Sequence, residues 1–405
     1  MRNYAVVTSA YFLFTLTDGA IRMLVLLHFY RLGYTPFTLA SLFLLYETAG
    51  IFANAFGGWL AVRFGIPRML ATGLALQIAG LLMLSALDPG WTAAASVIWV
   101  VCAQGLAGVA KDLTKTAAKS AIKASAQNGA AQLFRWVAWF TGSKNATKGA
   151  GFFLGGALLQ YVGFGPALWL MAGMLALVFV LVWTMLPRQL GQAKASKTVR
   201  ELFAKSRAIN LMAAARVFLF GARDIWFVVG LPVFLYASGW RFLEVAGFLA
   251  LWTIGYGAVQ AAAPALVRRS ADGLSREVPE ARLWGAALAA IPAVLALLLG
   301  FGLPRPDLVL VTGLCLFGVA FAVVSSLHSY LILAYAGSEK AAEDVGFYYA
   351  ANAAGRLVGI VLSGLLAEFG GITACLWGSS AMLGVCWLVT LLLPAQTAQK
   401  QARAA

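Results

Sequence analysis

Ionic side chains stand inside long apolar segments of this chain, where they could bind or move an ion. Asp18 and Arg22 lie in the first such segment, and Arg216, Arg223 and Asp224 lie in the one that begins near residue 210. The forked donors of an arginine fit the oxygens of a tetrahedral oxyanion. A buried carboxylate can orient such arginines or carry a proton. These residues therefore predict an anion pathway, although a structural pair of Asp18 with Arg22, four residues apart, would also satisfy two of the charges.

Two lysine-rich stretches place further positive charge in or next to the apolar segments. In KDLTKTAAKSAIK (111–123) a lysine recurs every fourth residue, which on a helix makes one slanting stripe. We expect Lys111 and Lys115 to line an anion entrance, and the later lysines to lie at the cytoplasmic edge. In GSKNATKGAG, Lys144 and Lys148 flank Asn145 within another apolar segment. A lysine within a span costs roughly 2.5–3.5 kcal/mol, which favours a compensating anion at Lys148.

Arg356 is a further intramembrane cation, and Tyr349 and Asn352 precede it within helical reach. Glu47 is a third carboxylate that could take up a proton, because burial disfavours its charged form. The expected substrate-binding residues are Arg22, Lys111, Lys115, Lys144, Asn145, Lys148, Arg216, Arg223, Tyr349, Asn352 and Arg356. The expected proton-coupling residues are Asp18, Glu47 and Asp224. Cations outnumber acids in this set, which indicates a multiply charged anion as the ligand.

The composition is that of a chain with many membrane spans. Hydrophobic residues make up 61% of it and charged residues only 11%, against roughly a quarter in soluble domains. At about 20 apolar residues per span, the chain predicts an all-α membrane protein with twelve transmembrane helices. They are expected at 4–28, 36–60, 68–88, 91–115, 138–162, 164–187, 210–236, 242–266, 282–303, 307–335, 343–368 and 370–394.

The two halves of the chain are weak copies of each other. FLFTLTDGA (12–20) overlays FLFGARDIW (218–226), and Lys148 overlays Arg356. Parallel repeats predict a binding site between the halves near the midplane of the bilayer. The expected domains are a six-helix bundle at 1–187, a cytoplasmic linker at 188–208, a second six-helix bundle at 209–395 and a cytoplasmic tail at 396–405. Lysine and arginine gather in alternate loops, which places both termini in the cytoplasm.

This layout resembles the major facilitator superfamily in detail. Gly58, Leu60, Arg63 and Gly65 fit its Gly-x-Leu-x-Asp-Arg-x-Gly pattern between the second and third helices, but Val62 replaces the aspartate. Gln104 and Gly105 fit its Arg-x-x-Gln-Gly pattern, but Val101 replaces the arginine often tied to proton coupling. The resemblance implies a gating role for Arg63. The two departures imply that coupling is either unconventional or absent, as in an anion uniporter driven by the membrane potential.

The strings KDLTKTAAKSAIK, FTGSKNATKGAGFFLGG, FLFGARDIWFVVGLPVFLY and YYAANAAGRLVG are similar to the ArsJ-type organoarsenical efflux permeases of bacteria. That resemblance implies export of 1-arseno-3-phosphoglycerate across the inner membrane, which confers arsenate resistance. It also implies functional pairing with a glyceraldehyde-3-phosphate dehydrogenase that makes this ester. The intramembrane carboxylates predict that inward proton flow drives this export. An oxyanion of pentavalent arsenic needs no clustered thiols, and the four cysteines of the chain stand singly.

Two alternatives remain from the sequence. Another phosphorylated metabolite, such as a phosphoglycerate or a sugar phosphate, would fit the same basic residues. A membrane-embedded enzyme or receptor would need a catalytic cluster or an extramembrane domain, and the sequence indicates neither. We expect no cofactor, no nucleic-acid partner despite the net charge of +15, and a monomer within the lipid bilayer.

Overall fold

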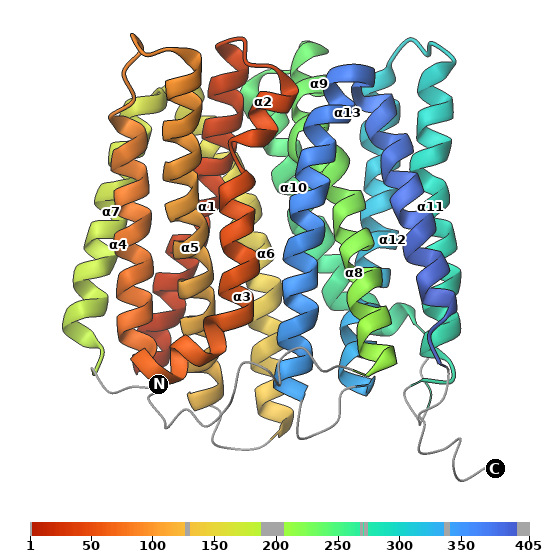
Figure 1. Ribbon diagram of the computed structural model, residues 1–405, viewed down its shortest axis with the longest axis horizontal. Coiled ribbons are helices and arrows are strands. Elements are labelled where there is room, and N and C mark those ends of the chain that lie inside the picture. The colour runs from red at the N-terminus through yellow and green to blue at the C-terminus, as the bar shows by residue number, and fades with distance from the viewer. Residues whose placement is uncertain are drawn as a thin grey trace. The chain divides into compact units, whose positions relative to one another are not determined.

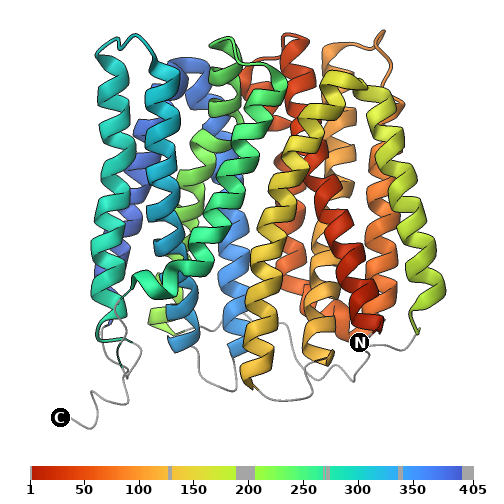
Figure 2. The same ribbon diagram turned by 180° about the vertical axis from the view of Figure 1, so that it is seen from behind.

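The protein is helical throughout the part of the chain that the structure describes, which is a computed structural model of residues 2–125, 130–187, 206–267, 270, 274–335 and 341–394. No strand occurs among these residues. The helices are α1 (Arg2–Arg31), α2 (Pro36–Ser41), α3 (Leu44–Phe64), α4 (Ile66–Ser85), α5 (Ala93–Ser125), α6 (Ala130–Tyr161), α7 (Phe164–Met185), α8 (Arg207–Ile225), η2 (Trp226–Gly230), α9 (Leu231–Ala237), α10 (Phe242–Leu266), α11 (Glu277–Gly300), α12 (Pro306–Tyr335) and α13 (Ala341–Leu391) (Figures 1 and 2).

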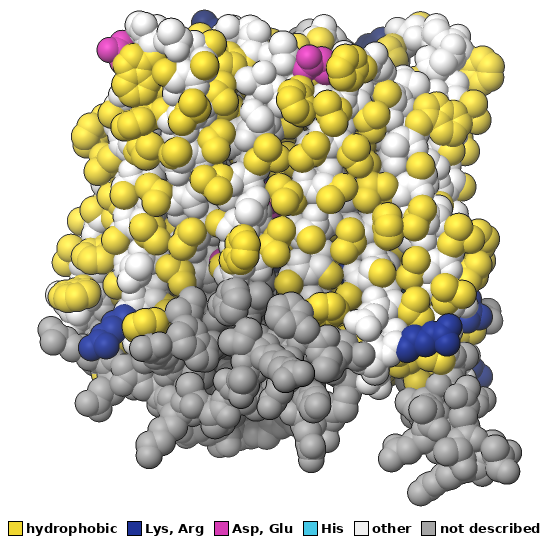
Figure 3. All heavy atoms as spheres, in the orientation of Figure 1, with side chains coloured by type: hydrophobic (Ala, Val, Ile, Leu, Met, Phe, Trp, Pro, Cys, Tyr) yellow, Lys and Arg dark blue, Asp and Glu magenta, His cyan; other side chains and the backbone are white. Residues whose placement is uncertain are grey.

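The predicted twelve-helix membrane fold is confirmed. Ten stretches of the described residues are long and apolar enough to cross a membrane. One of them lies within α13, which bends at Gly371 (φ +61°) and so contains two predicted spans. The 32-residue α6 corresponds to the predicted span at 138–162. Figure 3 shows a face on which hydrophobic side chains cover the helices, while charged side chains gather near the helix ends, as expected of helices surrounded by lipid.

Two spans are less regular than the sequence predicts. The second predicted span is divided into α2 and α3 by a turn at residues 42–43. The seventh contains the π-helix η2 between α8 and α9, in which an extra residue widens one turn. Pro232 follows directly in the first turn of α9, where its missing N–H costs little. These irregularities fall where long apolar runs give no periodic signal.

By its internal contacts the chain divides into two compact units. Unit 1 contains Met1–Ser196 and Gly239–Ile254, and unit 2 contains Lys197–Ser238 and Gly255–Ala405. The predicted linker falls mostly on residues 188–205, and the predicted tail on residues 396–405, and both stretches lie outside the described residues.

Glycines allow the helices of unit 1 to cross at close range. In α6, a Cβ at Gly151 would lie 2.4 Å from the Leu16 carbonyl oxygen of α1, and one at Gly155 would lie 2.2 Å from the Ala20 carbonyl oxygen. Figure 2 shows α6 running beside α1. Because a side chain at either position would meet backbone, these glycines fix how the two helices approach each other.

In unit 2, α8 packs along α13 in the same way. A Cβ at Gly355 would lie 2.2 Å from the Val217 carbonyl oxygen, and one at Gly359 would lie 2.5 Å from the Gly221 carbonyl oxygen. The two helices that carry the intramembrane arginines of this unit are therefore held backbone to backbone.

Candidate functional site

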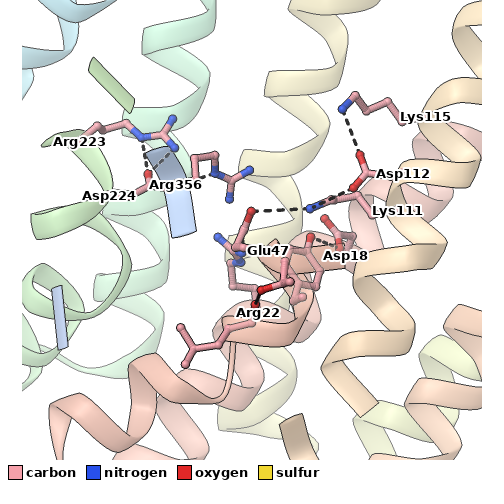
Figure 4. A network of polar contacts seen from close by, with 12 residues as sticks. Asp18, Arg22, Glu47, Lys111, Asp112, Lys115, Arg223, Asp224 and Arg356 are labelled. Atoms are coloured by element: carbon pink, nitrogen blue, oxygen red, sulfur yellow. Dashed lines mark hydrogen bonds and ion pairs between the residues drawn. The ribbon is translucent and has the colours of Figure 1, made fainter. Parts of the chain in front are cut away.

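A network of ionic side chains lies inside unit 1, on α1, α3 and α5. Arg22 donates a hydrogen bond to Glu47 Oε1 at 2.5 Å (Figure 4). Lys111 Nζ lies 3.9 Å from Glu47 Oε2 and 3.8 Å from Asp112 Oδ2, and Lys115 Nζ lies 3.1 Å from Asp112 Oδ1. Acids and cations alternate along this chain of contacts, so each charge has a neighbour of opposite sign.

Tyr46 joins this network to Asp18. Its hydroxyl donates to Asp18 Oδ1 at 2.6 Å, and its ring faces the Arg22 guanidinium at 4.9 Å and Lys111 Nζ at 3.9 Å. Cations on the faces of one aromatic ring are attracted by its quadrupole. The proposed pairing of Asp18 with Arg22 within the helix is wrong, because Arg22 reaches across to Glu47. Among the described residues, Asp18 forms no ion pair.

The position of Tyr46 follows from a close crossing of α3 and α5. A Cβ at Gly108 would lie 2.4 Å from the Tyr46 carbonyl oxygen, and one at Gly105 would lie 2.6 Å from Leu45 Cδ2. A side chain at Gly108 would meet the backbone of Tyr46 and separate the helices, whereas one at Gly105 would displace the Leu45 side chain. The crossing therefore fixes Tyr46 next to the segment of α5 that carries Lys111.

The lysines of α6 occupy a different part of unit 1. Lys144, Asn145 and Lys148 are all half-buried. Lys148 Nζ lies 5.6 Å from the centre of the Phe152 ring, and its backbone carbonyl faces Gly19 of α1. The structure therefore places Lys148 beside the helix that carries Asp18.

Unit 2 holds the residues predicted on its two arginine-bearing helices. Arg223 donates to Asp224 Oδ1 through Nε at 2.7 Å and also through Nη2, and Arg356 Nε donates to Asp224 Oδ2 at 3.0 Å (Figure 4). Asp224 is fully buried, whereas the arginine side chains are 14% and 15% exposed. Two arginines therefore share one acid.

Arg216 lies in a separate polar cluster of unit 2. Its Nε donates to Asn352 Oδ1 at 3.1 Å, and its Nη1 donates to the carbonyl and hydroxyl oxygens of Ser325 at 3.3 and 3.2 Å. The guanidinium lies 4.0 Å from the Phe220 ring centre and 4.7 Å from that of Tyr348. Tyr349 is half-buried next to Tyr348. We expected Asn352 to act beside Arg356, but its side chain instead accepts a hydrogen bond from Arg216.

The π-helix that follows Asp224 is held by α13. Ser363 Oγ accepts hydrogen bonds from the backbone N–H groups of Val229 and Gly230, both at 3.2 Å. An extra residue in a helical turn leaves backbone groups without their usual partners, and the buried Ser363 hydroxyl satisfies two of them.

Several residues of these clusters carried no sequence signal of their own. Tyr46, Phe220 and Ser325 are ordinary constituents of apolar helices, and only the helix crossings reveal what they contact. Arg63, the expected gating residue, lies on α3, and its side chain is outside the described part of the structure.

Comparison with known proteins gives the family of the chain. The family model described as Major Facilitator Superfamily matches residues 7–343. A crystal structure of a bacterial homologue of the iron transporter ferroportin, in an outward-facing state, is similar with a TM-score of 0.67 and 14% identity, over 98% of this chain and 100% of that chain. A crystal structure of a mutant of the nucleoside transporter NupG is similar with a TM-score of 0.71 and 15% identity, over 96% of this chain and 98% of that chain.

Identities this low show a shared fold and carry nothing about the substrate. None of the curated proteins compared with the chain matches it. The narrower resemblance to organoarsenical permeases stays a prediction. The match over most of the chain, the twelve-helix fold and the buried charges agree with one another: this is a multi-pass membrane protein that belongs to the major facilitator superfamily of transporters.

Proposed function

We propose that this protein exports 1-arseno-3-phosphoglycerate from the bacterial cytoplasm in exchange for protons. Export of this ester removes arsenic from the cell and confers arsenate resistance. The ester is supplied by a glyceraldehyde-3-phosphate dehydrogenase that uses arsenate in place of phosphate, so the permease and the enzyme act as a pair. The protein works as a monomer in the inner membrane, with both termini in the cytoplasm.

The Arg223–Asp224–Arg356 cluster is the observation that carries this proposal. Two guanidinium groups converge on one buried carboxylate, so arginines outnumber acids among these three residues. Nη1 of Arg223 makes no hydrogen bond within the described residues and could donate to a ligand oxygen. Asp224 holds both guanidinium planes in place, so its role is to orient the arginines. A cluster of this kind suits an oxyanion and disfavours a cation.

Asp18 is the carboxylate best placed to carry the coupled proton. Glu47 and Asp224 each contact cations, whereas the hydrogen bond from Tyr46 is the single contact of the Asp18 carboxylate among the described residues. A buried carboxylate without a cationic neighbour is costly while it is charged, and protonation removes that cost. The Tyr46 ring then links a change at Asp18 to Arg22 and Lys111.

The choice of substrate rests on the four quoted strings and on the oxyanion chemistry of the cluster. The same arginines would also serve a phosphoglycerate or a sugar phosphate. This second candidate differs from the first in the ester group and not in the binding residues, so transport experiments must separate them.

The test uses inside-out vesicles that contain the protein. Arsenic uptake from arsenate is followed with and without glyceraldehyde-3-phosphate, NAD and the dehydrogenase. Uptake that requires the complete enzyme system supports the proposal, whereas uptake from arsenate alone makes the protein an oxyanion carrier. If arsenic is not taken up but 3-phosphoglycerate is, the second candidate replaces the first.

Asp18→Asn tests the coupling separately. This variant should still exchange labelled for unlabelled substrate, because that reaction needs no net proton movement, but it should no longer accumulate substrate against a gradient. Accumulation equal to that of the wild type would exclude Asp18 as the proton carrier. Asp88→Asn is a matched control, because Asp88 lies in the loop after α4, where its Oδ1 accepts a hydrogen bond from the Gly90 N–H.

A further inference from the structure

Arg216 is a buried cation without a counter-charge in the described part of the chain. It is 4% exposed, and all its hydrogen-bond acceptors are neutral, namely the amide oxygen of Asn352 and the two oxygens of Ser325. No carboxylate of the described residues lies within ion-pair distance of it. Arg22, the other fully buried arginine of the described residues, has such a carboxylate, and so do the half-buried Arg223 and Arg356.

The surroundings of Arg216 stabilise its position and leave hydrogen-bonding capacity unused. Its Nη2 group makes no hydrogen bond within the described residues. His328, one turn after Ser325 on α12, lies within electrostatic range of Arg216, and both of its ring nitrogens are buried without a hydrogen bond. Burying an uncompensated cation beside unsatisfied polar atoms is costly unless a ligand completes the site. An anion has the charge and the acceptor atoms that would complete this site.

One aromatic ring separates this site from the Asp224 cluster. The Phe220 ring centre lies 4.0 Å from the Arg216 guanidinium carbon and 5.0 Å from that of Arg223. Arg216 and Arg223 are seven residues apart on α8, about two turns or roughly 10 Å along the axis. On the opposing helix, Asn352 contacts Arg216, and Arg356, one turn further along, contacts Asp224.

We infer that unit 2 contains two anion subsites, one at Arg216 and one at Arg223 with Arg356, separated by Phe220. The substrate class is therefore a short molecule that carries an oxyanion at each end, and its apolar middle lies against Phe220. This inference rests on the proposed anion transport and adds that one unit recognises both ends of the substrate. The sequence repeat had suggested one cation from each half, Lys148 and Arg356.

The charge balance of unit 1 supports this division of roles. The acids Asp18, Glu47 and Asp112 are matched in number by Arg22, Lys111 and Lys115 in its network. In unit 2, Arg223 and Arg356 share Asp224, and Arg216 has no carboxylate within ion-pair distance among the described residues.

The test measures binding of two stable probes to the purified full-length protein, by titration calorimetry. Propane-1,3-bisphosphonate carries an oxyanion at each end, and propylphosphonate carries one. The wild type should bind the bisphosphonate at least about tenfold more tightly, since one more charge-assisted contact is made. Arg216→Gln should remove this advantage while the affinity for propylphosphonate changes little. Arg305→Gln, on an exposed arginine of the same unit, should change neither affinity.

Each outcome decides between the two proposals. Equal affinity of the wild type for both probes overturns the two-subsite inference and leaves anion transport standing. The same holds if Arg216→Gln weakens both probes equally. If neither probe binds, both the inference and the proposed function fail.

A stability measurement separates ligand binding from a structural role. Because Arg216 lacks a counter-charge, Arg216→Gln should melt at or above the temperature of the ligand-free wild type, and a clear decrease would overturn the inference. If the glutamine variant does not fold, Arg216→Lys is used instead, because lysine keeps the positive charge on a shorter side chain. Its preference should then shift from propane-1,3-bisphosphonate towards butane-1,4-bisphosphonate, and an unchanged preference would count against two spaced subsites.

Discussion

The α8–α13 crossing should control both anion sites of unit 2, and Gly355→Ala tests this. The new Cβ would lie 2.2 Å from the Val217 carbonyl oxygen and 2.7 Å from the Val217 Cα. Ordinary van der Waals contact begins at 3.4 Å, so the two helices must separate locally by about 1 Å. Both neighbours are backbone atoms, which cannot turn away as a side chain would.

This separation would act on two hydrogen bonds that cross the interface. The Arg356–Asp224 and Arg216–Asn352 contacts are 3.0 and 3.1 Å long, and an increase of about 1 Å takes both beyond hydrogen-bonding range. Overpacking of this kind costs about 1–3 kcal/mol in stability. The loss of one charge-assisted hydrogen bond costs roughly 1.5–3 kcal/mol, so bisphosphonate affinity should fall about tenfold or more.

Gly384→Ala provides the matched control on the same helix. Nothing lies within 4 Å of a Cβ at Gly384, so this substitution should be neutral, or stabilising by up to about 1 kcal/mol because alanine favours the helix. Both variants are compared by thermal melting in detergent, by bisphosphonate titration and by export from vesicles. If Gly355→Ala and Gly384→Ala behave alike in all three, the crossing does not set the arginine geometry and the reasoning is wrong.

Three further substitutions probe separate parts of the molecule. Ser363→Ala should destabilise the protein by roughly 1–3 kcal/mol, because two buried N–H groups lose their acceptor. Hydrogen exchange of the Val229 and Gly230 amides should become faster, and unchanged exchange would show that Ser363 does not hold the π-helix. Lys148→Ala and Arg356→Ala should each abolish export while the protein still inserts in the membrane, as measured by vesicle uptake and immunoblot; near-normal export in both would remove these residues from the binding set. Arg63→Ala should slow transport cycling more than it weakens substrate binding, and a loss of affinity alone would contradict its gating role.

The class of the protein and its intramembrane charged residues follow from the amino-acid sequence without any knowledge of the fold. Length and hydropathy predict the twelve spans, because each backbone polar group in lipid must be satisfied within its own helix, and this constraint is local. The cost of placing charge in lipid likewise picks out Asp18, Lys148, Arg216 and Arg356 without reference to any fold. The excess of cations over acids follows from composition alone.

Tertiary structure alone decided which of these residues meet. Spacing along a helix suggested that Asp18 contacts Arg22, but Arg22 contacts Glu47. It also suggested that Asn352 lies with Arg356, but Asn352 contacts Arg216. Tyr46 and Phe220, which stand between pairs of cations, could not be found from spacing. The reason is physical: the side chains that face each other depend on how each helix is rotated and how closely it crosses its neighbour. Those quantities are set by glycine contacts between segments far apart in the chain, and no local pattern encodes them.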